Sequence, residues 1–297
     1  MENKTDVLES FNSLSEYLKK EEKIKNLNKY KKDFSAFLLH VRHLKAYDFI
    51  VPFCKDKRVL DIGCFLGYGE KIINSSAKEI IAIDIDDEAL AFASLNYSSA
   101  NVKFVKSDTK TLPFDNKSFD IILAFQLIEH IPPTKVIKFL EEARRVLKDD
   151  GLLFLTTPNR KTRLRLFQQP FNSEHYQEFT PNGLKRILKK IFPVVEVIGV
   201  TGEKWIREIE RGRVKKSFYQ SYKDSILRIL PKAVKNILLE TKSKMTKNKK
   251  PAGDKKALIM DRFEELFDRF SMKDFYLEKQ KKLIDKSLDL LAICSKQ

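Results

Sequence analysis

Short runs of apolar residues alternate with helix-like patterns through the middle of the chain. The runs 58–62 and 80–84 are bounded by turn residues, whereas 134–148 has the spacing of an amphipathic helix. Alternating strands and helices are typical of a parallel sheet covered on both faces, which binds ligands at the carboxyl ends of its strands. We therefore expect a doubly wound α/β fold, with a sixth strand at 194–200 and a seventh at 288–294 that pairs antiparallel and closes the sheet edge.

Helical patterns flank this core. Apolar residues share one face over 8–18, and a second helix is expected over about 34–53. The stretch 205–285, between the last two strands, is longer than a hairpin connection, so it predicts an insertion with its own helices. The expected organisation is a helical cap at 1–56, the core at 57–204, a basic helical insertion at 205–285 and the final core strand at 286–297.

The first strand runs into a glycine-rich turn over residues 61–67. Gly63 and Gly67 allow the backbone to approach a ligand where a Cβ would collide. Asp84 ends the next strand, 21 positions after Gly63, where a carboxylate can accept bonds from two ribose hydroxyls. The dinucleotide fingerprint would need three glycines, and aromatic residues stand at the second and third of those positions. A nicotinamide or flavin cofactor is therefore disfavoured.

These segments resemble class I S-adenosylmethionine (SAM) dependent methyltransferases. The first motif, D-x-G-x-G-x-G, is matched over 61–67 except for Phe65, which replaces the middle glycine. The stretch 101–109 is similar to the family's third strand and the acidic residue that follows it. The stretch 112–125 is similar to the L-P-F-x-x-x-x-F-D stretch that leads into the family's fourth strand. The resemblance implies a Rossmann-like seven-stranded sheet. Residues 152–160 end in T-P-N-R, as in the sugar- and quinone-type branch of these enzymes.

The resemblance implies SAM as the cofactor, with Asp84 on the ribose and Asp108 on the adenine. We expect Phe65 either to hold a less strained backbone than a glycine would or to turn its ring away from the methionine moiety. Alternatives remain for the acids: Asp61 could cap the following turn, Asp108 could cap a turn or helix, and 86–88 could form the acidic first turn of a helix. The predicted cofactor-binding residues are Tyr47, Asp61, Gly63, Gly67, Asp84, Ile85, Asp108, Thr109, Phe125 and Gln126.

Three residues are candidates for catalysis. Glu129 and His130 match the E-H pair that follows the fourth strand in the family. His175 lies in a segment similar to N-P-F-H-x-x-E-Y, where Asn172 holds the histidine position and His175 is shifted. Each can serve as a base towards an oxygen nucleophile, and each can instead be a structural hydrogen-bonding group. No metal site is predicted, since 40 and 43 are the only closely spaced histidines and offer no third ligand.

The net charge of the chain is +16, and 204–256 carries 17 Lys or Arg against 5 Asp or Glu, a net of +12. Within it, 226–239 has an amphipathic pattern and 242–256 is lysine-rich. Three interpretations compete: a solvated lid helix, peripheral contact of 205–256 with an anionic membrane surface, and nucleic-acid binding. The last is disfavoured because no RNA-binding motif accompanies the charge, although the charge does not exclude it.

We expect O-methylation of a sugar, glycolipid or quinone-like acceptor, which is either a small molecule or linked to a glycan or lipid. The alternatives are an RNA methyltransferase and an inactive methyltransferase-like scaffold. Three cysteines without paired spacing indicate a reducing compartment, and the amino terminus has no apolar signal region. The expected location is the cytoplasm, with peripheral contact at the inner membrane surface as an alternative.

Overall fold

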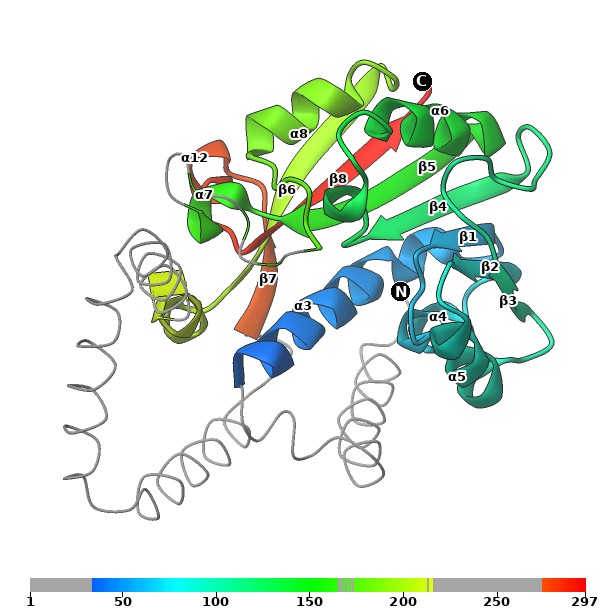
Figure 1. Cartoon of the computed structure of the whole chain (residues 1–297), viewed down its shortest axis with the longest axis horizontal. Helices are drawn as coiled ribbons and strands as arrows, with labels where there is room; N and C mark the ends of the chain where they lie inside the picture. The colour runs from blue at the N-terminus through cyan, green and yellow to red at the C-terminus, as the bar shows by residue number, and fades with distance from the viewer. Residues whose placement is uncertain are drawn as a thin grey trace, which may run out of the picture. The chain divides into compact units, whose positions relative to one another are not determined.

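The structure, a computed structural model, describes residues 34–164, 168, 170, 172, 174–212, 214–215 and 274–297 (Figure 1). By contacts, the chain divides into two compact units, and the features discussed below belong to the unit made of 41–229 and 271–297. The helix expected at 8–18, the amphipathic stretch 226–239 and the lysine-rich tract 242–256 lie outside the described residues.

The described part of the chain forms one twisted sheet in the order β3-β2-β1-β4-β5-β8-β6-β7. Neighbouring strands from β3 to β5 are parallel, whereas β8 runs antiparallel to β5 and β6, and β7 antiparallel to β6. The strands are β1 (Arg58–Ile62), β2 (Glu79–Asp84), β3 (Val102–Lys106), β4 (Phe119–Phe125), β5 (Leu147–Pro158), β6 (Val194–Gly202), β7 (Phe275–Glu278) and β8 (Asp289–Ser295).

The α/β class expected from the sequence is confirmed, but two details of the sheet were wrong. The sheet has eight described strands rather than seven, because the four-residue β7 lies inside the stretch expected to be a helical insertion. The last strand pairs antiparallel as expected, yet it lies between β5 and β6 instead of at the edge. Its side chains are mostly buried, as is typical of a strand that is covered on both faces of the sheet.

The helices follow the expected alternation. Asp86 accepts hydrogen bonds from the backbone of Glu88 at 2.9 Å and of Ala89 at 3.1 Å, so the acidic stretch 86–88 does begin a helix. The described helices are α3 (Phe34–Ile50), η2 (Val51–Cys54), α4 (Tyr68–Ile73), α5 (Asp87–Tyr97), η3 (Ile128–His130), α6 (Val136–Val146), α7 (Arg160–Arg163), α8 (Pro181–Leu188), residues 204–212 and α12 (Lys281–Ile284).

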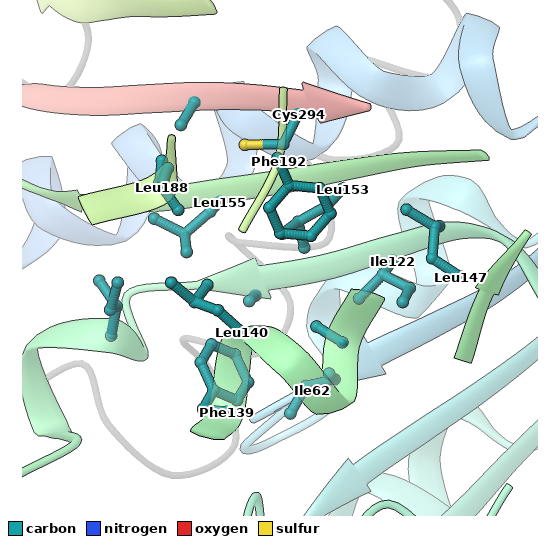
Figure 2. Close-up of a cluster of buried hydrophobic side chains, with 14 of the residues drawn as sticks. Ile62, Ile122, Phe139, Leu140, Leu147, Leu153, Leu155, Leu188, Phe192 and Cys294 are labelled. Atoms are coloured by element: carbon teal, nitrogen blue, oxygen red, sulfur yellow. The ribbon is translucent and has the colours of Figure 1, made fainter. Parts of the chain in front are cut away.

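Successive residues of the central strands face opposite layers of the core. In β4, Ile122 joins the cluster that contains Phe139 of α6 and Leu188 of α8, shown in Figure 2. The neighbouring Leu123 belongs to a second cluster, with Ile50 of α3 and other apolar residues of α3 and α4. This two-residue period places helices on both faces and leaves the carboxyl ends of β1, β2 and β4 free to form a site.

A buried group of charges joins α3 to the carboxyl-terminal part of the chain. The Nε of Arg42 lies 3.0 Å from Oδ2 of Asp289 in β8, and its Nη1 lies 3.5 Å from Oε2 of Glu210. Removing one partner of a buried ion pair costs about 3–5 kcal/mol, because a charge is then left without compensation. Arg42 therefore fixes the helix at 204–212 against the sheet.

Within the described residues, no helix is both long enough and apolar enough to cross a lipid bilayer.

Candidate functional site

The glycine-rich turn joins the carboxyl ends of β1 and β2. The backbone nitrogens of Gly63 and Cys64 donate to the carbonyl of Ile83, at 2.8 and 3.1 Å. Gly63 has a φ of 82° and Gly67 a φ of 75°, which favour glycine. A Cβ on Gly67 would lie 2.7 Å from the side chain of Ala93, so the space is also closed to larger residues.

Phe65 has a left-handed backbone conformation, which favours glycine. Its φ is 48°, so of the two expected alternatives the less strained backbone is ruled out, and the side chain is 52% exposed. The backbone nitrogen of Phe65 donates to Oδ2 of Asp84 at 2.8 Å, while Oδ1 accepts from the nitrogens of Ile85 at 2.7 Å and Asp86 at 3.0 Å. The Asp84 carboxylate therefore ties the turns after β1 and β2 together.

A cavity of about 460 Å³ opens beside this turn. Of the expected cofactor residues, Gly63, Asp84, Ile85, Asp108 and Thr109 line it, and so does His130. The other expected residues do not line it: Tyr47, Asp61, Gly67, Phe125, Gln126, Glu129 and His175. Sequence reasoning missed Leu127, Ile131, Pro132 and Lys135, which also line the cavity and lie within five positions of the E-H pair.

Asp108 is half-exposed at the cavity and also shapes its own turn. Its Oδ1 accepts from the backbone nitrogen of Lys110 at 2.9 Å, and Oδ2 lies 3.3 Å from the ammonium of the same residue. The hydrogen bond from the Lys110 backbone holds the pKa of Asp108 below its usual range. The two interpretations of Asp108, ligand contact and turn formation, are therefore compatible in one residue.

Asp61 lies behind the turn and is fully buried. It accepts a hydrogen bond from the hydroxyl of Tyr47 at 2.7 Å, and its other neighbour is the buried Glu70 at the start of α4. Burial raises the pKa of Asp61 to about 6, although the hydrogen bond from Tyr47 lowers it. Burial and the charge of Asp61 raise the pKa of Glu70 well above its ordinary value. Glu70 is therefore the protonated member of the pair at neutral pH.

Gly69 is a structural requirement of this region that sequence reasoning missed. A Cβ at Gly69 would lie 2.1 Å from the ring of Tyr47, so α4 can approach α3 only with glycine there. The Nδ1 of His43 lies 2.8 Å from the hydroxyl of Tyr68, so this histidine connects α3 to the start of α4. The contacts of Tyr47, His43 and Tyr68 place α3 directly behind the glycine-rich turn.

A second group of polar residues follows β4. The backbone nitrogen of Gln126, whose φ is 50°, donates to the hydroxyl of Thr156 at 3.1 Å. The Thr157 hydroxyl donates to Oε2 of the fully buried Glu129 at 2.9 Å. Two threonines at the end of β5 therefore hold the segment that carries the E-H pair.

The structure brings all three candidate catalytic residues together. The rings of His130 and His175 meet edge to face with centroids 4.7 Å apart, and Nδ1 of His175 lies 3.2 Å from Oε1 of Glu178. Burial raises the pKa of Glu129 to about 8, with a smaller contribution from Asp289. Burial lowers the pKa of His130, and His175 lowers it further.

The T-P-N-R turn at the end of β5 has a structural role. The side-chain nitrogen of Asn159 donates to the carbonyls of Ile284 at 3.1 Å and Ser287 at 2.9 Å, while its oxygen accepts from the nitrogen of Lys161 at 3.1 Å. This buried side chain connects β5 to the segment before β8. The turn therefore positions Thr156 and Thr157 rather than lining the cavity.

A parallel sheet with a glycine-rich turn after its first strand and a carboxylate after its second defines a nucleoside-binding α/β domain. Residues 60–155 match the sequence family described as a methyltransferase domain. The resemblance to SAM-dependent methyltransferases is therefore confirmed over residues 60–155, which match a methyltransferase domain. The expected cofactor, SAM, is supported by the same comparisons.

The chain matches its curated relatives over only part of their length. A probable S-adenosylmethionine-dependent methyltransferase of Mycobacterium tuberculosis (strain CDC 1551 / Oshkosh) is 34% identical over 147 residues, which are 50% of this chain and 52% of that protein. A ubiquinone biosynthesis O-methyltransferase of Paraburkholderia phymatum is 30% identical over 141 residues, 46% of this chain and 59% of that protein. The chain thus spans between half and three fifths of the length of these two relatives.

Solved structures agree on the fold. A SAM-dependent methyltransferase from Archaeoglobus fulgidus aligns with a TM-score of 0.50 at 18% identity, covering 94% of this chain and 98% of that chain. A SAM-dependent methyltransferase from Thermotoga maritima, described as a possible histamine N-methyltransferase, aligns with a TM-score of 0.52 at 13% identity, covering 90% and 98%. At such identities the likeness shows the fold alone.

Proposed function

We propose that this chain transfers the methyl group of SAM to a hydroxyl oxygen of a sugar, a glycolipid or a quinone-like ring. The observation that carries the proposal is the position of Glu129, His130 and His175 beside the cavity at the glycine-rich turn. The O-methyltransferase name of the Paraburkholderia phymatum relative supports an oxygen acceptor.

The residues around the cavity fit a nucleoside cofactor. At Gly63 a Cβ would lie 3.2 Å from the side chain of Leu127, so the glycine keeps the backbone accessible. We assign the Asp84 carboxylate to the ribose hydroxyls and that of Asp108 to the adenine amine, with Ile85, which is 66% exposed, against the adenine ring. When bound, SAM supplies a methyl group that its sulfonium has already activated.

The protein then has to hold the acceptor oxygen in line and to manage its proton. His130 lines the cavity, so it is the member of the three that reaches a bound hydroxyl directly. The hydroxyl of Thr157 donates to the side chain of Glu129, and the backbone nitrogen of Tyr176 donates to its backbone carbonyl at 2.9 Å. Both hydrogen bonds hold Glu129 in place. This fixed arrangement supports positioning as the main source of rate.

The test begins with calorimetric titration of the full chain with SAM. The protein is then incubated with methyl-labelled SAM and extracts separated into lipid, glycan, small-molecule and RNA pools. Label in a hydroxyl-bearing lipid, glycan or ring compound is the expected result. Label confined to RNA would support the RNA methyltransferase alternative instead, and failure to bind SAM would support a scaffold role.

We further propose that the basic segment 205–256 lies outside the SAM-binding core and attracts an anionic partner, such as a lipid-linked acceptor at the inner membrane surface of the cytoplasm. The charge count supports this, because a net of +12 over the 53 residues 204–256 produces a local field. At the described start of the segment, Arg207 and Arg211 line a cavity of about 220 Å³, and its lining contains more basic residues than acidic ones. The basic residues are Arg42, Lys161, Arg163, Arg207, Arg211 and Lys286, and the acidic ones are Glu210 and Asp285.

Vesicle binding tests this second proposal. The chain is expected to bind vesicles that contain phosphatidylserine and not neutral vesicles, with binding that weakens as salt increases. A deletion of 242–256 should reduce that binding and leave SAM affinity unchanged. Equal binding before and after the deletion would contradict the proposal.

A further inference from the structure

Glu129, His130 and His175 converge on one point. Each offers one ligand atom, and the three atoms all lie within 4.8 Å of one another. Two of the residues belong to η3 at the end of β4, and the third comes from the loop before α8, 45 positions later. A carboxylate oxygen and two imidazole nitrogens are ligands that suit divalent transition metals.

One oxygen of the Glu129 carboxylate makes no hydrogen bond among the described residues. Oε2 accepts from Thr157, so the oxygen in question is the buried Oε1. A buried polar atom without a partner is costly, and cores rarely contain one without a reason. A cation bound at the cluster would give this oxygen its partner.

Glu178 orients one of the two imidazoles. Its side chain is fully buried, and Oε1 lies 3.2 Å from Nδ1 of His175. A carboxylate at Nδ1 favours the tautomer with the proton on that nitrogen, which leaves the electron pair of Nε2 available. Histidines that bind metals usually have such a second partner. The Nε of Arg163 lies 3.2 Å from the same oxygen of Glu178, so this carboxylate is held from two sides.

We propose that Glu129, His130 and His175 form a binding site for a divalent transition metal ion, Zn²⁺ or Mn²⁺, at the edge of the SAM cavity. Three protein ligands leave coordination positions open, as in catalytic metal sites. His130 lines the cavity, so an open position can face it and take the oxygen of an acceptor hydroxyl.

The role of the ion rests on the proposed O-methylation, whereas its binding does not. A hydroxyl oxygen held by the ion loses its proton to solvent more readily, because the metal stabilises the resulting oxyanion. His130 is then a ligand rather than the base, and Glu178 is a positioning residue. The acceptor class narrows to compounds whose reacting hydroxyl can reach a metal ion, which includes rings and sugars with a neighbouring second oxygen.

The experiment uses the full chain, purified without a histidine tag and stripped with a chelator. Calorimetric titration with Zn²⁺ and with Mn²⁺ should show one site for at least one ion. His175→Ala and Glu129→Gln should abolish that site, and Glu178→Gln should weaken it by roughly 10–100-fold, as loss of an outer-shell partner does. His40→Ala, which removes a histidine of α3, serves as the matched control and should bind as the parent does.

A titration with SAM on each variant separates this inference from the proposed function. SAM affinity should be unchanged in all four variants, which also shows that they fold. Metal binding that is lost in Glu129→Gln and in His175→Ala supports the site even if no methyl transfer is found. The inference is overturned if the stripped parent binds neither ion, or if Glu129→Gln and His175→Ala bind as tightly as the parent.

Discussion

The turn after β1 and the cluster after β4 lie at the same edge of the sheet, yet they are built in different ways. The turn is made from residues close in sequence, and its strained backbone at Phe65 is held by the half-exposed carboxylate of Asp84. The cluster joins residues from η3, the end of β5 and the loop before α8, with Glu129 fully buried.

The difference suggests that the turn serves cofactor binding and the cluster serves methyl transfer. A local turn with exposed backbone nitrogens and carboxylates suits a ligand shared by a large family of enzymes. A buried carboxylate beside two imidazoles has a perturbed pKa, as groups that react often do. Substitutions at the turn should therefore change SAM affinity, and substitutions at the cluster should change turnover.

The largest expected effect is at the cluster. His130→Ala removes the cavity-facing imidazole, which acts on the hydroxyl proton either as a base or as a metal ligand. We expect kcat to fall by roughly 10²–10⁴ while SAM affinity is retained. Steady-state kinetics and calorimetry measure the two quantities. A loss of SAM affinity equal to the loss of kcat would remove the distinction between the two regions.

Asp84→Ala tests whether the glycine-rich turn determines SAM affinity. The carboxylate is assigned to the ribose and already holds the backbone of Phe65 and Ile85, so its removal should weaken SAM binding by at least about tenfold, or roughly 1.5–3 kcal/mol. Asp87→Ala, three residues on in α5, is the control and should bind SAM normally. Unchanged affinity of Asp84→Ala would reject the assignment.

Gly69→Ala should disturb the support of the turn rather than the ligand contacts. The new Cβ would lie 2.1 Å from the Tyr47 ring, and the overpacking should cost about 1–3 kcal/mol, or a drop of roughly 3–10 °C in Tm. Gly212→Ala is the matched control, because no atom of the described residues lies within 4 Å of a Cβ there. Equal Tm values for the two variants would show that α4 can move away without cost.

The sequence predicted what is local and missed what is tertiary. The strand, turn and carboxylate of the SAM site follow from short patterns, because each glycine and acid lies at a strand end. Glu70 reads as a polar residue at a helix start, and only packing reveals that it is buried against Asp61. Thr157 lies in the T-P-N-R stretch, but the sequence does not show that it bonds to Glu129, which lies 28 positions away in another motif. The contact of Glu178 with His175 likewise gave no signal.

The Asp61–Glu70 pair predicts a pH dependence of stability. The folded pKa of Asp61 is about 6 and that of Glu70 is also raised, so the folded chain binds protons more tightly than the unfolded chain. The pair therefore lowers the free energy of unfolding progressively as pH rises from about 4 through the raised folded pKa values, and the penalty is complete only above both.

Glu70→Gln should reduce this loss, with a gain of roughly 1–3 kcal/mol over the parent at pH 8 and a smaller difference at pH 4. Denaturant unfolding at the two pH values measures it. Glu141→Gln, on the exposed face of α6, should show no such pH-dependent gain. A Glu70→Gln variant that is less stable than the parent at pH 8 would mean that the charge of Glu70 is needed for folding.

The smallest expected effect is at Phe65, whose backbone is strained and whose ring is exposed. A left-handed φ costs a residue other than glycine about 1–2 kcal/mol, and Phe65→Gly removes this strain. Glycine also lowers the free energy of unfolding by about 0.5–1 kcal/mol, because it has more conformational freedom in the unfolded chain. We expect a net gain in stability of no more than about 1 kcal/mol and a SAM affinity within about tenfold of the parent. Phe65→Ala keeps the strain and removes the ring, so it separates the two contributions. If Phe65→Ala lowers SAM affinity and Phe65→Gly does so equally, the ring itself contacts the cofactor and the turn binds SAM through more than its backbone.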